Sequence, residues 1–225
     1  MKKIIITITI CFIWTVNILG QDKCSKYYPL EKGTRFQVTM LDNKNKTTGV
    51  IDYLVKEYSD NSAILSYEMH DEKGKMIAAS EYGMTCTDKG VSIDFKSLAA
   101  PGIMEQYKDM EIDITGSDLI LPNNLSVGQT LPDAEMMMNV KVTPINLKMN
   151  FNISNRKVEG SEKITTSAGI FDCIIISYDH ESKMGIKISG RAKQWLAEGV
   201  GLVKQESYNK KGKLMGTSIL TAFQK

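Results

Sequence analysis

Few residues of this 225-residue chain stand in a pattern that could do chemistry. His180 and Glu181 open the zinc-protease pattern His-Glu-x-x-His, but Met184 stands where the second histidine is needed. Residues 178–185 are therefore interpreted as a polar turn. Gly199 and Gly201 form a lone Gly-x-Gly before a strand-like run, whereas a dinucleotide site needs a third glycine at the start of a helix.

Further catalytic signatures do not occur in the sequence: it has no Gly-x-Ser-x-Gly, no Walker loop and no Cys-x-x-Cys. Two histidines and no dense Cys/His cluster leave little material for a metal site. We therefore expect no catalytic residue, no metal and no cofactor, that is, a protein that is not an enzyme. A hydrolase without a recognisable motif, with its carboxylates, His or Ser gathered in a cleft, is the alternative.

Methionine is the residue type that stands out, because 13 occur and Met136, Met137 and Met138 are consecutive. Methionine is flexible and polarizable, which suits both irregular cores and adaptable binding surfaces. Neighbouring residues on a strand point to opposite faces, so part of this run is expected at the surface or beside a cavity. Together with Met149 these residues are the candidate surface for an apolar ligand or partner protein. Core packing is the alternative, and a copper(I) thioether site lacks an accompanying His or Cys.

The first twenty residues have the features of a secretory signal peptide. A basic start with Lys2 and Lys3 precedes sixteen residues, four of them polar, that fall short of the roughly 20 apolar residues of a membrane span. We expect cleavage after Gly20, export, and no stable membrane span afterwards. The mature chain is then neutral, with 26 basic and 26 acidic residues, and gives no electrostatic reason to expect nucleic acid or an anionic membrane surface.

Export affects how the cysteines are interpreted. Cys11 leaves with the signal, so Cys24, Cys86 and Cys173 remain, and one disulfide plus one thiol is expected in an oxidising compartment. Three pairings are open. We favour Cys24 with Cys86, because this bond would pin the start of the mature chain onto a sheet, and leave Cys173 as a buried thiol. Lipidation of Cys24 is not expected, since polar residues precede it.

Period-two alternation of apolar and polar residues predicts a mostly β protein. We expect an antiparallel meander that forms a curved sheet, a half-barrel or a sandwich, with one short helix near 101–110. Polar turns at 42–46, 71–75 and 209–213 have hairpin chemistry, and their lysines are interpreted as solvated loop tips.

The two halves of the mature chain resemble each other weakly. Each opens on a similar Gly-Thr run, at 29–34 and 125–130, and each contains one Lys-Gly-Lys turn. We place the signal peptide at 1–20, an N-terminal β half at 21–117 and a C-terminal β half at 118–225. A duplication, a recurring hairpin idiom and one continuous domain all remain open.

Three runs of the sequence carry a family resemblance: residues 27–34, residues 167–173 and residues 195–214. In this spaced order they resemble the TapB-type family of exported bacterial proteins. The resemblance implies the periplasm or exterior of a Gram-negative-type bacterium and a layout analogous to the curved-sheet carriers of lipoprotein localisation. It brings no catalytic residues with it.

Structural roles are expected for four residues of these runs. Gly169 should form a turn that feeds a strand, Trp195 should be buried with its N–H bonded, and Gly199 and Gly201 should shape a bend. The function expected from the sequence is that of an exported binding protein for a lipid, another apolar ligand or an envelope protein. A structural or protein-interaction module of the envelope is the alternative.

Overall fold

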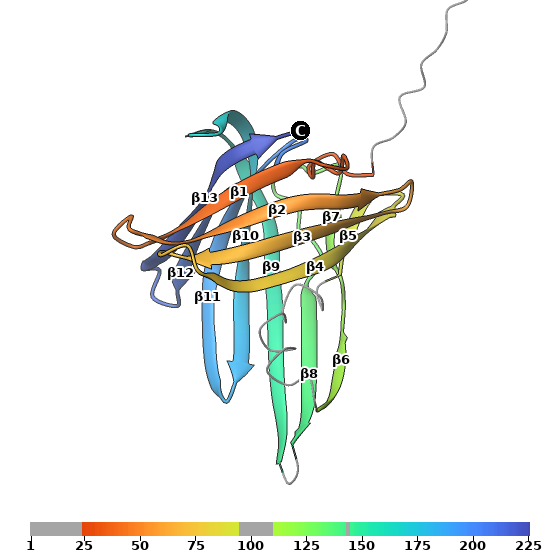
Figure 1. Ribbon diagram of the computed structural model, residues 1–225, viewed down its shortest axis with the longest axis vertical. Helices are drawn as coiled ribbons and strands as arrows, with labels where there is room; N and C mark the ends of the chain where they lie inside the picture. Colours follow the sequence, from red (N-terminus) through yellow and green to blue (C-terminus); the bar gives the residue numbers. More distant parts are fainter. Residues whose placement is uncertain (1–23, 95–109, 143–144) are drawn as a thin grey trace, which may run out of the picture.

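The computed structural model describes residues 24–94, 110–142 and 145–225 (Figure 1). These residues form one antiparallel sheet of thirteen strands in the order β6-β8-β9-β10-β11-β12-β13-β1-β2-β3-β4-β5-β7. The strands are β1 (Arg35–Asp42), β2 (Thr47–Tyr58), β3 (Ser62–Asp71), β4 (Met76–Thr87), β5 (Gly90–Ile93), β6 (Glu111–Gly116), β7 (Leu119–Pro122), β8 (Ala134–Val142), β9 (Ile145–Thr166), β10 (Gly169–Met184), β11 (Ile186–Ala197), β12 (Gly201–Asn209) and β13 (Leu214–Gln224).

The prediction of an antiparallel β fold is confirmed, and of the predicted shapes the structure shows a single open sheet rather than a barrel or sandwich. Figure 1 shows β1–β4 running across β8–β11, so the sheet curves until two of its parts face each other. One core lies between these parts, because Val55 and Leu65 share a cluster with Val158 and Ile176. Alternating apolar residues supply this core from both sides, and that burial drives the curvature.

No helix occurs among the residues described, and they include only the last residue of the short helix expected near 101–110. Residues 101–109 lie outside the described part of the chain, and Met110 forms a bend before β6. The predicted signal peptide and its cleavage after Gly20 lie outside it as well. No helix that could span a membrane is found in the segments that the structure covers.

Three hairpin turns share one geometry, as their sequences predict. In each, the side-chain oxygen of Asp42, Asp71 or Asn209 accepts backbone N–H bonds from the residues two and four positions on, at 2.8–3.1 Å. The left-handed position is taken by Asn45 in the first turn and by a glycine in the others. Because β12, β13, β1, β2, β3 and β4 are successive neighbours, all three turns lie at the same end of these strands.

One short connection in the chain joins the two edge strands of the sheet. β6 and β7 are the two edge strands, and only residues 117–118 separate them. β6 pairs with β8, and β7 pairs with β5. Each of the two predicted halves therefore gives an edge strand to the other half.

A disulfide joins Cys24 to Cys86, with their Cα atoms 5.1 Å apart, which is the pairing favoured from the sequence. It ties the segment before β1 to the end of β4. The same segment packs through Tyr27 and Leu30, both nearly fully buried. Cys173 is a free and buried thiol, and burial raises its pKa to about 11.

Candidate functional site

The register of the sheet lines up apolar side chains from five strands on one face. Cross-strand pairs join Ile114 to Met138, Met138 to Met149, Met149 to Met184 and Met184 to Ile186. Residues that pair directly across antiparallel strands point to the same face. These five side chains therefore form one continuous row from β6 to β11.

A second row runs beside the first, two residues away on each strand. It contains Met136 and Phe151, which pair with each other, and Ile188, which pairs with Ser182. Ser182 in turn pairs with Phe151, so this row crosses the same strands with one polar member. We call the apolar residues of both rows the apolar strip: Ile114, Met136, Met138, Met149, Phe151, Met184, Ile186 and Ile188.

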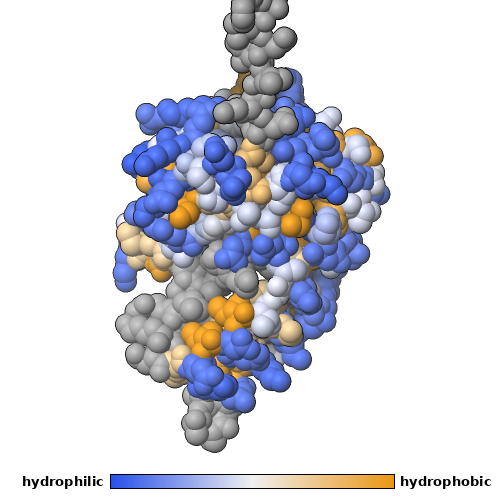
Figure 2. Space-filling model, turned by 90° about the vertical axis from the view of Figure 1, so that its right-hand side faces the viewer, coloured by the Kyte–Doolittle hydropathy of each residue, from blue (hydrophilic) through white to orange (hydrophobic). Residues whose placement is uncertain are grey.

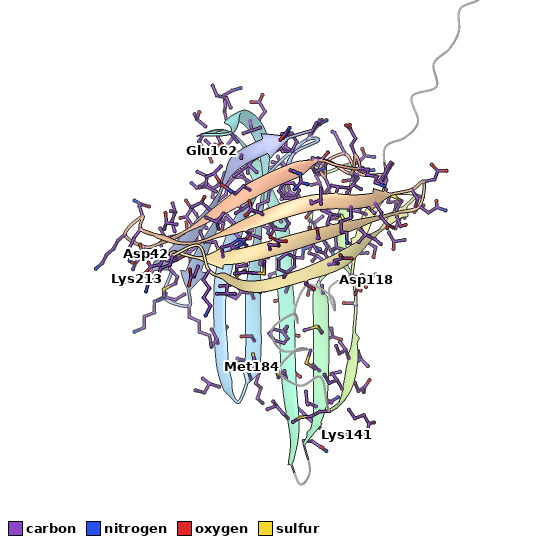
Figure 3. All side chains as sticks on the ribbon, in the orientation of Figure 1. Asp42, Asp118, Lys141, Glu162, Met184 and Lys213 are labelled. Atoms are coloured by element: carbon purple, nitrogen blue, oxygen red, sulfur yellow. A yellow bond between two sulfur atoms is a disulfide. The ribbon has the colours of Figure 1, made fainter. Side chains whose placement is uncertain are left out.

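Exposure changes sharply along the apolar strip. Met138 and Met149 are completely buried, whereas Met184 is 48%, Ile186 78% and Ile188 64% exposed. Figure 3 shows Met184 in the part of β10 and β11 that projects past β4. The strip is therefore core at β8 and β9 and open surface at the β10–β11 hairpin.

The methionines singled out in the sequence divide between the two faces of β8. Met136 and Met138 are fully buried, as is Met149, while Met137 is 45% exposed on the opposite face. The buried ones pack against half-buried residues of β6 and β9, including Ile112. Figure 2, seen from the side of β6 and β7, shows hydrophobic residues gathered in the narrower lower part of the molecule, below a largely hydrophilic upper part.

The sequence pattern does not predict the open end of the apolar strip. It predicts a polar turn at residues 178–185, but β10 runs through Met184 and only Gly185, with a φ of 76°, makes the turn. The physical reason is cross-strand pairing, because every residue from Asp179 to Met184 has a partner on β11. The sequence holds a usable signal, because Met184, Ile186 and Ile188 recur at every second position.

A polar hollow of about 680 Å³ lies beside the same hairpin and is the place where a hydrolase would be sought. Its lining includes Asp179, His180, Glu181, Ser189 and Arg191. His180 pairs with Gly190 and Ser189 pairs with Glu181, so the imidazole and the hydroxyl leave opposite faces of the sheet. That arrangement keeps His180 from acting as the base for Ser189.

The carboxylates of this hollow are held by a neighbouring amide and by neighbouring cations. Asp179 accepts hydrogen bonds from Asn155 Nδ2 at 2.9 Å and Arg191 Nε at 3.2 Å, and these bonds lower the pKa of its carboxyl group. Glu181 is paired with Lys187 Nζ at 2.6 Å. Burial lowers the pKa of His180, so its imidazole is neutral near pH 7. These groups form ion pairs rather than a nucleophile with its base.

The residues assigned structural roles occupy turns and core. Gly169, with a φ of 143°, opens β10 after a two-residue turn. Gly199, with a φ of 66°, lies between β11 and β12, and Gly201, with a φ of 89°, is the first residue of β12. Trp195 is 5% exposed, and its Nε1–H donates to Glu162 Oε2 at 2.8 Å. Its indole is therefore buried and bonded, as expected.

Comparison with protein families gives a match over most of the chain. The model of the DUF3108-like family matches residues 31–220. The chain belongs to the DUF3108-like family. This match does not confirm the TapB-type resemblance of the three sequence runs, which stays a prediction. A search of curated proteins found no match.

Solved structures share the fold of this DUF3108-like protein. A protein from Bacteroides fragilis, described as exported and as having a YmcC-like fold, is 21% identical, with a TM-score of 0.71 over 90% of this chain and 100% of that one. A protein from Parabacteroides distasonis, described as a lipoprotein, is 22% identical, with a TM-score of 0.68 over 89% and 99%. At these identities the likeness is one of fold.

Proposed function

We propose that this DUF3108-like protein is an exported, non-enzymatic binding protein whose apolar strip takes an apolar ligand such as a lipid acyl chain. One observation carries the proposal: the row that is buried core at Met138 and Met149 continues in register to Met184 and Ile186, where it is open. An extended hydrocarbon chain laid on the open end would continue the buried layer.

The binding free energy available to such a ligand follows from the exposed fractions of the side chains at the open end of the apolar strip. Fully burying a Met or Ile side chain contributes about 1.5–3 kcal/mol. Met184, Ile186 and Ile188 are 48%, 78% and 64% exposed, so covering all three contributes about 4 kcal/mol on the protein side. The ligand's own apolar area adds to this, which brings micromolar binding within reach.

Export is supported from two directions. The basic and apolar start of the chain fits a signal peptide, and both solved relatives are described as exported or as a lipoprotein. The TapB-type resemblance and its analogy to lipoprotein-localisation carriers stay predictions. Both favour an apolar ligand such as a lipid.

The test uses a fluorescent fatty acid and a pair of matched variants. Ile188→Asn removes an apolar side chain from the strip, and Ile170→Asn changes an equally exposed isoleucine, 66% against 64%, at the far end of β10. We expect Ile188→Asn to weaken fatty-acid binding about tenfold and Ile170→Asn to leave it unchanged. Equal affinities for the two variants, or a purified protein without bound lipid by native mass spectrometry and extraction, would reject an apolar ligand.

An apolar segment of an envelope protein is the second candidate, because the open end of the strip is a surface rather than an enclosed cavity. The hollows described around it are lined by polar side chains, and Met184, Ile186 and Ile188 are not among their lining residues. A photo-crosslinking residue at Ile186 separates the candidates. Crosslinks to a defined protein from envelope fractions, with no lipid bound, would favour the protein partner.

A further inference from the structure

The sheet topology gathers lysines that are far apart in sequence. The turns β1–β2, β3–β4 and β12–β13 contain seven exposed lysines: Lys44, Lys46, Lys73, Lys75, Lys210, Lys211 and Lys213. Neighbouring turns are two strands apart, about 10 Å, so the row is about 20 Å long. Figure 3 shows Asp42 of the first turn beside Lys213 of the third. We call this row of turns the lysine edge.

Most of this charge has no ion-pair partner among the residues that the structure describes. Across the segments that the structure describes, the salt bridge at the lysine edge joins Lys46 to Glu72 at 2.8 Å. Asp42 and Asp71 direct their carboxylates at backbone N–H groups of their own turns. The turns hold seven lysines against three carboxylates in a mature chain with equal numbers of basic and acidic residues. Charge is therefore segregated to one end of the sheet.

Exposed apolar side chains follow directly after two of these turns. Met76 and Ile77 come after Lys75 and are 51% and 55% exposed. Met215 comes two residues after Lys213 and is 52% exposed. Lysines beside exposed apolar residues are the composition of surfaces that bind at the headgroup level of a bilayer. A soluble polyanion would use the lysines but give these apolar side chains no place to be buried.

We propose that the lysine edge is a docking surface for an anionic lipid bilayer. The lysines contact headgroup phosphates, and Met76, Ile77 and Met215 enter the boundary between headgroups and acyl chains. Electrostatic attraction of this kind decays within about 8 Å of the membrane at physiological salt, so binding requires the edge to face the surface. The surface uses no residue of the apolar strip and stands independently of the proposed function.

Vesicle co-sedimentation of the purified protein tests this surface. Vesicles containing one-third phosphatidylglycerol in phosphatidylcholine are compared with pure phosphatidylcholine, at low and high salt. Lys210→Ser with Lys211→Ser removes two lysines of the edge. The matched control is Lys32→Ser with Lys89→Ser, which removes two exposed lysines at the opposite ends of the strands. Thermal unfolding of each variant checks that it is folded.

We expect salt-sensitive binding to the anionic vesicles and little to phosphatidylcholine. Each lysine near an anionic surface contributes a factor of about five, so the edge variant should bind about 25-fold more weakly while the control stays unchanged. Met215→Ser should weaken binding further without changing its salt dependence. Equal losses in both lysine variants, no binding to either vesicle, or binding to heparin without binding to vesicles would each overturn the proposal.

Discussion

Removing the disulfide between Cys24 and Cys86 should destabilise the protein without changing its folded structure. The bond closes a loop of 62 residues, and loop-closure entropy then gives a loss of roughly 4 kcal/mol in the free energy of unfolding. Tyr27 and Leu30 are almost fully buried, and this packing should keep the segment before β1 docked without the bond. The loss of stability therefore comes from the greater conformational entropy of the unfolded chain without the bond.

The variant Cys24→Ala with Cys86→Ala is measured by urea unfolding, followed by the fluorescence of Trp195, and by near-UV circular dichroism. With a slope of about 2 kcal/mol per molar urea, the midpoint should fall by about 2 M. Cys173→Ala is the control, since it removes a buried thiol and keeps the disulfide, and should cost about 1 kcal/mol. A loss below about 1 kcal/mol in the double variant, or a further loss when reductant is added to it, would refute the loop argument.

Three further predictions concern buried groups. Met138→Ala should cost about 3 kcal/mol in urea unfolding because Met138 is fully buried, whereas Met137→Ala, on the exposed face, should cost less than about 1 kcal/mol. The pKa of His180 is lowered from 6.5 in the folded protein, so the unfolded chain binds this proton more tightly than the folded protein does. The contribution of His180 to the free energy of unfolding is therefore complete above pH 6.5 and is lost as the pH falls through the folded-state pKa. Urea titrations from pH 4 to 8 should show a free energy of unfolding that rises with pH, and His180→Asn should make this rise smaller. An unchanged rise in the variant would contradict the lowered pKa of His180. The Cys173 thiol, with its pKa raised to about 11, should resist iodoacetamide at pH 8 until urea unfolds the chain, as followed by mass spectrometry.

Local chemistry was predictable from the sequence because each signal lay within a few residues. Alternation identified the antiparallel β class, and the turn starting at Asp42 was recognisable from its Asp, Asn and Lys spacing. The buried and bonded state of Trp195 followed from the general behaviour of indoles in cores. The open shape of the sheet was not predictable, because it depends on which strands pair.

The apolar strip and the lysine edge depend on pairings between distant residues, and for this reason the sequence alone does not predict them. Met149 and Met184 meet only because β9 and β10 are long and in register, which no local pattern specifies. The net charge indicated no preference for an anionic surface. It could not show that the turns at 42–46 and 209–213 are neighbours, because that depends on the pairing of β1 with β13.

That pairing has a consequence for how the protein is made. β13 lies between β12 and β1, so residues 214–224 connect the strands formed early in the chain to those formed late. Without these residues the remaining strands can form only two partial sheets with unpaired edges, and unpaired edges are prone to wrong association. The sequence separation of about 190 residues between Arg35 and Gln224 also makes this closing step slow. Truncation before Leu214 should therefore leave two partial sheets with no strand to join them.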